Sequence, residues 1–101
     1  MLIYVSHPYG GKEENKKAVE DIIRKLAADN PQHTYISPIH CFGFMYNDVS
    51  YESGLDMCLN LLNKCDKMAV CGDWESSKGC TAEVLFAKAH MIPYEIVGEC
   101  S

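Results

Sequence analysis

The sequence alternates short β-prone apolar runs with segments of helical periodicity, and this alternation constrains the fold more than any other feature. The apolar runs occupy residues 2–5, 34–36, 67–71 and 94–97. Apolar residues recur at helical spacing over about 13–29, 51–63 and 77–90. Strands that alternate with helices pair in parallel, with right-handed crossovers that place helices on both faces of the sheet. We therefore expect an α/β chain with three layers, α-β-α.

The strand order predicts where a ligand would bind. With the order 2-1-3-4, the chain would form a small flavodoxin-like or Rossmann-like domain, with four or five parallel strands. In such sheets the ligand lies beyond the carboxyl ends of the strands, where the order reverses. That point falls between the first and third strands, which are followed by residues 6–12 (SHPYGGK) and 72–79 (GDWESSKG). These two loops are therefore expected to meet at one site.

The second loop is rich in polar side chains. It contains Asp73, Glu75, Ser76, Ser77 and Lys78, flanked by Gly72 and Gly79. Ser76 and Ser77 either cap the helix that follows or, together with its free N–H groups, hold an anion such as phosphate. Trp74 either stacks on a planar ring or covers the edge of the sheet.

Glu83 is the carboxylate that we single out for chemistry. The helical spacing of Ala82, Leu85, Phe86 and Ala89 predicts that these four side chains face inward. Glu83 would then tilt toward the crevice, where a carboxylate can act as a nucleophile or general base. The alternative is an ordinary solvated glutamate on a helix surface.

The first loop and residues 39–50 supply further candidate ligand-binding residues. Pro8 fixes its own backbone angle, while Gly10 and Gly11 allow a tight turn with exposed N–H groups. Tyr9 either offers its phenol to a ligand or packs. Residues 39–50 are expected to form an aromatic-rich loop that covers a ligand or a partner. His40, in that loop, has no carboxylate partner evident in the sequence.

Size, charge and cysteine content exclude several classes of function. The 101 residues fit one domain, 1–101. A domain of this size leaves enough apolar surface for a homo-oligomer, and residues 98–101 are expected to fray.

A net charge of −5 with nine basic residues argues against nucleic-acid binding. The apolar run at 1–5 is too short to direct export, so we expect a cytoplasmic protein. The six cysteines show neither a C-x-x-C motif nor zinc-ligand spacing, so we expect no metal or cofactor.

Several sequence motifs occur together: YVSHPYGG at 4–11, Asn15, ISP at 36–38, CD at 65–66 and GDWESSKGCTAE at 72–83. Together they resemble the small nucleoside 2-deoxyribosyltransferase-like proteins, and within them the family DUF4406. The DUF4406 pattern runs roughly Y-I-S-G-P-Y-R-G, N, C-D and G-W-x-x-S-x-G-x-x-x-E. The resemblance spans almost the whole chain, although His7 replaces the usual glycine, Gly10 the usual arginine and Leu85 a common glycine.

The resemblance implies a flavodoxin-like fold that acts on the N-glycosidic bond of nucleosides or nucleotides. It implies that Glu83 attacks the anomeric carbon, that Tyr4 is the strand tyrosine of the nucleotide hydrolases, and that Ser77 lies near the 5′ group. Asp56 is the nearest match to an aspartate on the second helix. The candidate catalytic residues are thus Glu83, Tyr4 and Asp56. The candidate ligand-binding residues are Ser6, Pro8, Tyr9, Gly10, Gly11, His40, Asp73, Trp74, Ser76, Ser77 and Gly79.

Other functions stay open at this point. A non-catalytic sensor or sequestering protein would bind a nucleotide in the same crevice and leave it unchanged. A small interaction module would use the aromatic loop on a protein partner and bind no nucleotide. A redox role for the thiols lacks a paired-cysteine motif.

Overall fold

The structure is a computed structural model that describes residues 1–97, and its centre is a parallel sheet in the order β2-β1-β3-β4. The strands are β1 Leu2–Ser6, β2 Thr34–Ile36, β3 Lys67–Val70 and β4 Tyr94–Ile96. All three neighbouring pairs are parallel. The expected flavodoxin-like strand order is confirmed, with four strands in the described part of the chain. The predicted frayed end, 98–101, lies outside the described residues.

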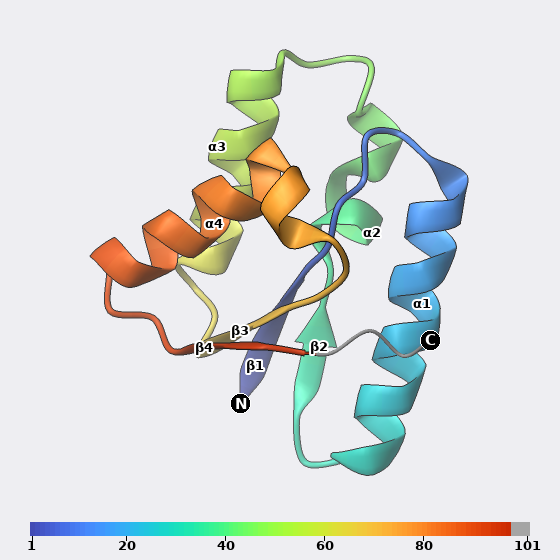
Figure 1. Cartoon of the computed structure of the whole chain (residues 1–101), viewed down its shortest axis with the longest axis vertical. Helices are drawn as coiled ribbons and strands as arrows, with labels where there is room; N and C mark the ends of the chain where they lie inside the picture. Colours follow the sequence, from blue (N-terminus) through green and yellow to red (C-terminus); the bar gives the residue numbers. More distant parts are fainter. Residues whose placement is uncertain (98–101) are drawn as a thin grey trace.

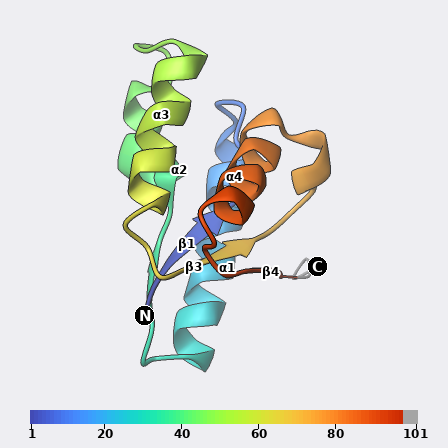
Figure 2. The ribbon, with the colours of Figure 1, turned by 90° about the vertical axis from the view of Figure 1, so that its left-hand side faces the viewer.

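Helices cover both faces of this sheet. They are α1 Glu13–Asp29, α2 Pro38–Phe42, α3 Tyr51–Leu62 and α4 Lys78–Ala89, with single 3-10 turns η1 Gly43–Met45 and η2 Trp74–Ser76. Figure 1 shows α1 on one side of the strands and α3 and α4 on the other. The view in Figure 2 shows α3 and α4 side by side, as their mutual contacts require.

The longest helix, α1, has the bounds that its sequence predicts. Glu13 and Glu14 occupy its first turn, where carboxylates favour the positive end of the helix dipole. Val19 and Ile22 are its buried residues. At its C-terminus, the backbone N–H of Asn30 donates to the carbonyl of Leu26, and so does the Asn30 side chain at 3.1 Å. These bonds satisfy a carbonyl that the helix end would otherwise leave without a partner.

The core consists of two clusters on opposite faces of the sheet, because successive residues of a strand point in opposite directions. Tyr4 packs in the cluster with Leu62, Met68, Val70, Val84 and Ala87, from α3, β3 and α4. Val5 packs in the other, with Val19, Ile22, Ile39 and Cys71. Tyr4 and Val5 are both fully buried, and β1 is an interior strand of the sheet, between β2 and β3.

Residues 39–50 differ from the expected loop. The short helix α2 begins at Pro38 after the N-cap Ser37, and η1 follows it directly. A proline suits the first turn of a helix because it has no N–H to leave unpaired. Ile39 is buried in the second core cluster, so this segment is anchored to the sheet through α2.

The buried face of α4 also differs from the expectation. Its buried residues are Cys80, Glu83, Val84 and Ala87, whereas Leu85 is 65% exposed and Ala89 is exposed. Apolar residues occur almost all round this helix, so periodicity alone does not identify the side that faces the sheet. Val84 and Ala87 face the core in place of Leu85 and Ala89, whereas Phe86 packs against the core as expected, and Glu83 is buried together with Val84 and Ala87.

Candidate active site

A cavity of about 570 Å³ opens at the carboxyl edge of the sheet. Four segments line it: the loop after β1, α2 with η1, the first half of α3, and the start of α4. In Figure 1 these segments gather at the upper end of the molecule. The two loops that the topology predicted to meet therefore do so, with the aromatic segment as a third wall.

Glu83 of α4 lies in this cavity and is held by two hydroxyl groups of β1. Its side chain is only 5% exposed. Ser6 Oγ donates to Glu83 Oε1 at 2.7 Å, and the Tyr4 hydroxyl donates to Oε2. Tyr4 and Ser6 are two residues apart in the strand, so their side chains leave the same face of the sheet. The carboxylate is thus fixed in orientation, and each of its oxygens accepts from one donor.

The electrostatics of this group reflect two opposing causes. Burial raises the pKa of Glu83 above its ordinary value, while the hydrogen bonds from Tyr4 and then Ser6 lower it. The pKa of Tyr4 lies well above its ordinary value because of burial and the adjacent Glu83 charge. Tyr4 therefore stays a neutral donor at physiological pH. A buried carboxylate with fixed donors and little water around it can serve as a nucleophile or a base.

The start of α4 forms another part of the wall. Ser77 is the N-cap, and its Oγ accepts from the N–H of Cys80 at 3.2 Å, so the capping role is present. Ser76, Ser77 and Gly79 all line the cavity. Lys78 also lines it and holds its ammonium 5.6 Å from the centre of the Tyr51 ring. Hydroxyls, a helix N-terminus and a cation therefore share this wall.

The loop after β1 is shaped by Gly10 and Gly11, which have φ of 61° and 73°. The side chain of Asn15 donates to the carbonyl of Tyr9 at 2.9 Å and ties the loop to α1. Tyr9 and Gly10 line the cavity, and the Tyr9 ring meets the Tyr46 ring edge-on at 5.1 Å. A side chain at Gly11 would meet the Tyr46 ring at 3.0 Å. The loop and the aromatic segment therefore pack closely on each other.

Other predicted site residues lie elsewhere. Asp56 is exposed on α3 and does not line the cavity, nor does exposed Asp73. Trp74 packs against the first core cluster. Pro8 and Gly11 shape the first loop without lining the cavity.

His40 faces a second, shallower cleft of about 400 Å³ between α1 and α2. Its Nε2 lies 2.9 Å from Glu20 Oε2, a carboxylate partner that the sequence did not reveal. The hydrogen bond to His40 lowers the pKa of Glu20. The structure therefore separates His40 from the cavity that contains Glu83.

Several lining residues were not predicted as site residues. They are His7, Lys78, Tyr51, Cys58 and Cys80, with apolar side chains from α2, η1 and α3. Lys78 belongs to the polar loop at 72–79, so its position in the sequence could have identified it as a site residue. The sequence predicted that Cys58 fills space along the apolar side of a helix. Nothing in its local sequence distinguishes that role from lining a cavity. Within residues 1–97, no three His, Cys, Asp or Glu side chains gather to hold a metal ion.

No helix in the described part of the chain is long and apolar enough to cross a membrane.

No curated protein matches the sequence. Among solved structures, the fold is similar to that of the "2-desoxiribosyltransferase from Leishmania mexicana", with a TM-score of 0.68 and 15% sequence identity. The match covers 96% of this chain and 63% of that one. This similarity shows that the two proteins share a fold, the flavodoxin-like fold that the motifs implied.

The family is not the one that the motifs suggested. The model of a domain of unknown function, DUF7768, matches residues 1–97, which is nearly the whole chain. The expectation of DUF4406 is corrected accordingly: motifs such as YVSHPYGG and GDWESSKGCTAE resemble that family without identifying it. The chain belongs to the family DUF7768.

Proposed function

We propose that this protein is an enzyme that cleaves or transfers the N-glycosidic bond of a nucleoside or nucleoside 5′-monophosphate, with Glu83 as nucleophile. One observation carries the proposal: the only carboxylate that lines the cavity, within residues 1–97, is buried and bonded to two hydroxyls. The solvated alternative for Glu83 does not fit a side chain that is 5% exposed. The deoxyribosyltransferase fold supports the same reaction class.

The reaction follows from the position of this carboxylate. One Glu83 oxygen attacks the anomeric carbon as the bond to the base nitrogen breaks, through an oxocarbenium-like state. The base keeps the electron pair of the broken bond and takes a proton from solvent water as it leaves, and the sugar stays attached as an ester of Glu83. Water or a second base then attacks the same carbon and gives its proton to solvent, while the bond from that carbon to the Glu83 oxygen breaks and restores the carboxylate. Tyr4 and Ser6 hold the carboxylate at a fixed angle throughout.

The cavity suits such a ligand. Its volume of about 570 Å³ lies within the range of small-molecule sites. Tyr9, Phe42 and Tyr46 supply aromatic surface for a base. The start of α4 with Lys78 supplies N–H groups and a positive charge for an anionic 5′ group. We therefore place the base toward the aromatic wall and the 5′ end toward α4.

Product analysis tests the reaction. The purified protein is incubated with ribo- and deoxyribonucleosides and their 5′-monophosphates, with and without an added free base, and products are separated by chromatography and identified by mass spectrometry. Glu83→Gln keeps the shape and removes the nucleophile, so release or exchange of base should fall by about 10³-fold or more. Glu75→Gln, in an exposed carboxylate of the neighbouring 3-10 turn, is the matched control.

The outcomes separate the enzyme from its alternative. Activity that survives Glu83→Gln would contradict the nucleophile assignment. If every nucleoside returns intact, calorimetric binding of the same panel identifies the non-catalytic nucleotide-binding protein. The preferred substrate decides whether a ribose, a deoxyribose or a 5′-phosphate is recognised.

We further propose that the protein forms a homo-oligomer. Large apolar side chains remain exposed at the rim of the cavity and on α4, including Phe44 at 80%, Tyr51 at 52% and Leu85 at 65%. Large apolar side chains left exposed to this extent are candidates for a contact between subunits. Light scattering after size-exclusion chromatography should give a mass of at least twice 11.3 kDa. A monomer at micromolar concentration would contradict this proposal.

A further inference from the structure

The loop after β1 places a histidine ring at the cavity, and the reaction proposed above gives this ring no role. His7 lines the cavity and directly follows Ser6, the residue that donates to Glu83 Oε1 at 2.7 Å. The His7 side chain therefore starts from a Cα that lies about 3.8 Å from that of Ser6. The DUF4406 pattern has a glycine at this position, so the resemblance assigns no function to the ring.

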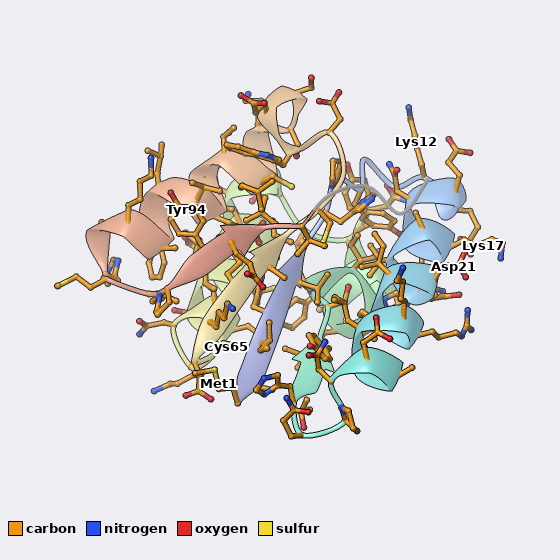
Figure 3. The ribbon with its side chains drawn as sticks, turned by 60° about the horizontal axis from the view of Figure 1, so that its bottom comes forward. Met1, Lys12, Lys17, Asp21, Cys65 and Tyr94 are labelled. Atoms are coloured by element: carbon orange, nitrogen blue, oxygen red, sulfur yellow. The ribbon has the colours of Figure 1, made fainter. Side chains whose placement is uncertain are left out.

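Of the four histidines, all of which lie within residues 1–97, His7 alone lines this cavity. His40 faces the second cleft, and exposed His90 is the C-cap of α4. The Nδ1 of His33 lies 3.3 Å from the amino nitrogen of Met1. Figure 3 shows Met1 at the start of β1, which is the end of the strand away from the cavity. His7 is thus the one imidazole beside the carboxylate of the proposed reaction.

The surroundings of the His7 ring determine which of its two nitrogens carries a proton. Nδ1 lies 2.7 Å from the carbonyl oxygen of Pro8, which can only accept, so Nδ1 is the donor. In the neutral ring, Nε2 is then an acceptor. Nε2 has no hydrogen-bond partner within residues 1–97, and no buried side-chain nitrogen of those residues lacks a partner. Nε2 is therefore open to solvent and to a ligand.

Gly72, which begins the loop after β3, makes room for this ring. A Cβ at Gly72 would lie 2.8 Å from His7 Nε2 and 3.0 Å from its Cδ2, so a residue with a side chain would displace the imidazole. The ring thus lies between the two loops that the topology brings together. The Pro8 carbonyl fixes it at Nδ1, and the backbone of Gly72 packs beside Nε2.

The proposed reaction needs a proton transfer at two points. The nucleobase takes up a proton as it leaves, and the water or second base that attacks must give one up. Glu83 forms the bond to the sugar, so it is not available for either transfer. The other proton donors that line the cavity are phenols, aliphatic hydroxyls, thiols and one ammonium, which give up a proton less readily than an imidazolium does. His7 is the lining residue whose chemistry suits both transfers.

We propose that His7 is the general acid and base of the reaction, in place of solvent, a role that rests on the proposed function. In the first step, a Glu83 oxygen bonds to the sugar carbon, and the nucleobase leaves with the electron pair of the broken bond. Protonated His7 gives its Nε2 proton to the leaving nucleobase and keeps its Nδ1 proton on the Pro8 carbonyl. In the second step, Nε2 takes a proton from the attacking water or second base. The bond from the sugar carbon to Glu83 breaks, and both side chains are restored.

The tautomer of His7 in the free protein tests the structural part. Long-range ¹H–¹⁵N correlation spectra of the neutral ring, assigned by their loss in His7→Asn, distinguish a proton on Nδ1 from one on Nε2. We expect the proton of His7 on Nδ1. His40 is the internal contrast, with its proton on Nε2, because that nitrogen lies 2.9 Å from Glu20 Oε2. A neutral His7 ring that is protonated on Nε2 would overturn the proposal.

Leaving-group dependence tests the catalytic part. His7→Asn keeps an N–H for the Pro8 carbonyl but cannot transfer a proton, and His7→Gln is a second variant with the same defect. His90→Asn is the matched control, because the Nδ1 of His90 also lies 3.0 Å from a carbonyl oxygen, that of Phe86, outside the cavity. The substrates are pairs from the class that the parent cleaves: a purine nucleoside with its N7-methyl derivative, or a pyrimidine nucleoside with its 5-fluoro derivative. An N7-methylated purine leaves as a neutral molecule without a proton, and a fluorinated pyrimidine leaves more readily as an anion.

In both His7 variants, kcat for the unmodified nucleoside should fall about 10²- to 10⁴-fold, and the loss for the modified nucleoside should be smaller by about tenfold or more. KM should change little, and His90→Asn should match the parent. Circular dichroism melting curves confirm that each variant is folded.

Three results would overturn the role of His7 while the proposed function stands: full activity of the His7 variants, equal losses on both nucleosides of a pair, or a loss in KM alone. In the last two cases the ring only supports the loop or contacts the ligand. A parent that cleaves no nucleoside would overturn the proposed function, and the role of His7 with it.

Discussion

Replacement of Tyr4 by Phe removes one of the two hydrogen bonds that hold Glu83. The side chain is fully buried, and its hydroxyl donates to Glu83 Oε2. Phenylalanine keeps the ring and removes only the donor, so the core packing around β1 changes little. The effect on the free energy of unfolding is therefore that of one hydrogen bond to Glu83. Its size depends on whether Glu83 is ionised.

The pH dependence has a definite sign. Burial raises the pKa of Glu83 in the folded protein above that in the unfolded chain. Between these two pKa values the folded state binds a proton that the unfolded chain has released, so the stability of the parent falls as pH rises through this window. The Tyr4 hydrogen bond lowers the pKa of Glu83. Tyr4→Phe consequently widens the window and increases the fall.

The magnitudes follow from the type of bond that is lost. At low pH, where Glu83 is protonated, loss of a neutral hydrogen bond costs about 0.5–1.5 kcal/mol of unfolding free energy. Above the window, loss of a bond to the carboxylate costs about 1.5–3 kcal/mol. The destabilisation by Tyr4→Phe should therefore be about 1–1.5 kcal/mol larger at pH 8 than at pH 4.

Urea unfolding of the parent, Tyr4→Phe, Glu83→Gln and the double variant, at both pH values, provides the measurement. In the Glu83→Gln background, where no carboxylate titrates at this position, Tyr4→Phe should cost the same at both pH values. Equal destabilisation by Tyr4→Phe at pH 4 and pH 8 in the parent background would refute the reasoning, because Glu83 would then not change its charge beside Tyr4.

Two further predictions concern the loop after β3 and a thiol that lines the cavity. Gly72 has φ of 70°, and a Cβ there would lie 2.8 Å from His7 Nε2, so Gly72→Ala should destabilise the protein by about 1–3 kcal/mol in urea unfolding. Gly54→Ala, in helix α3 with its nearest contact at 3.6 Å, should not destabilise and is the control. With a pKa of about 11 against an ordinary 9.0, the Cys58 thiol should react with iodoacetamide at pH 8 about 100-fold more slowly than in the urea-unfolded chain. Mass spectrometry of the alkylated peptides measures this ratio, and equal rates would contradict the burial of the thiol.

The order of the elements was predictable because it rests on patterns within short windows. Periodicity defined α1 at Glu13–Asp29, the alternation of strands and helices predicted a parallel sheet, and the flavodoxin-like order 2-1-3-4 was the arrangement expected for it. Short or evenly apolar segments lack such a pattern. Helix α2 has five residues, too few to show a helical period. Helix α4 is apolar on most sides, so its buried face is determined by packing against β1, β3 and α3 rather than by its own sequence.

The candidate site was predictable in part. Topology brought the loops after β1 and β3 together, the helical spacing indicated that Glu83 would tilt toward the crevice, and the family resemblance selected Tyr4. The contacts that hold Glu83 join residues 79 and 77 positions apart, so no local pattern contains them. The same holds for Cys58, which reads locally as apolar filling and lines the cavity with Glu83 only in the folded chain. His40 and Asp56 show the opposite case. Their residue types suggested that they bind a ligand, but neither lines the cavity that contains Glu83.

One signal for this site does exist in the sequence of β1. A central strand covered on both faces normally carries apolar side chains on each, yet Tyr4 and Ser6 place two hydroxyls on the face toward α4. Both are fully buried, and a buried hydroxyl needs a hydrogen-bond partner. The backbone N–H and C=O groups of the neighbouring strands bond to one another within the sheet. The acceptor for the two hydroxyls must therefore be a side chain of a covering helix. Of the buried residues of α4, Glu83 alone has a carboxylate. Alternating hydroxyls in a buried strand thus predict a buried acid above it.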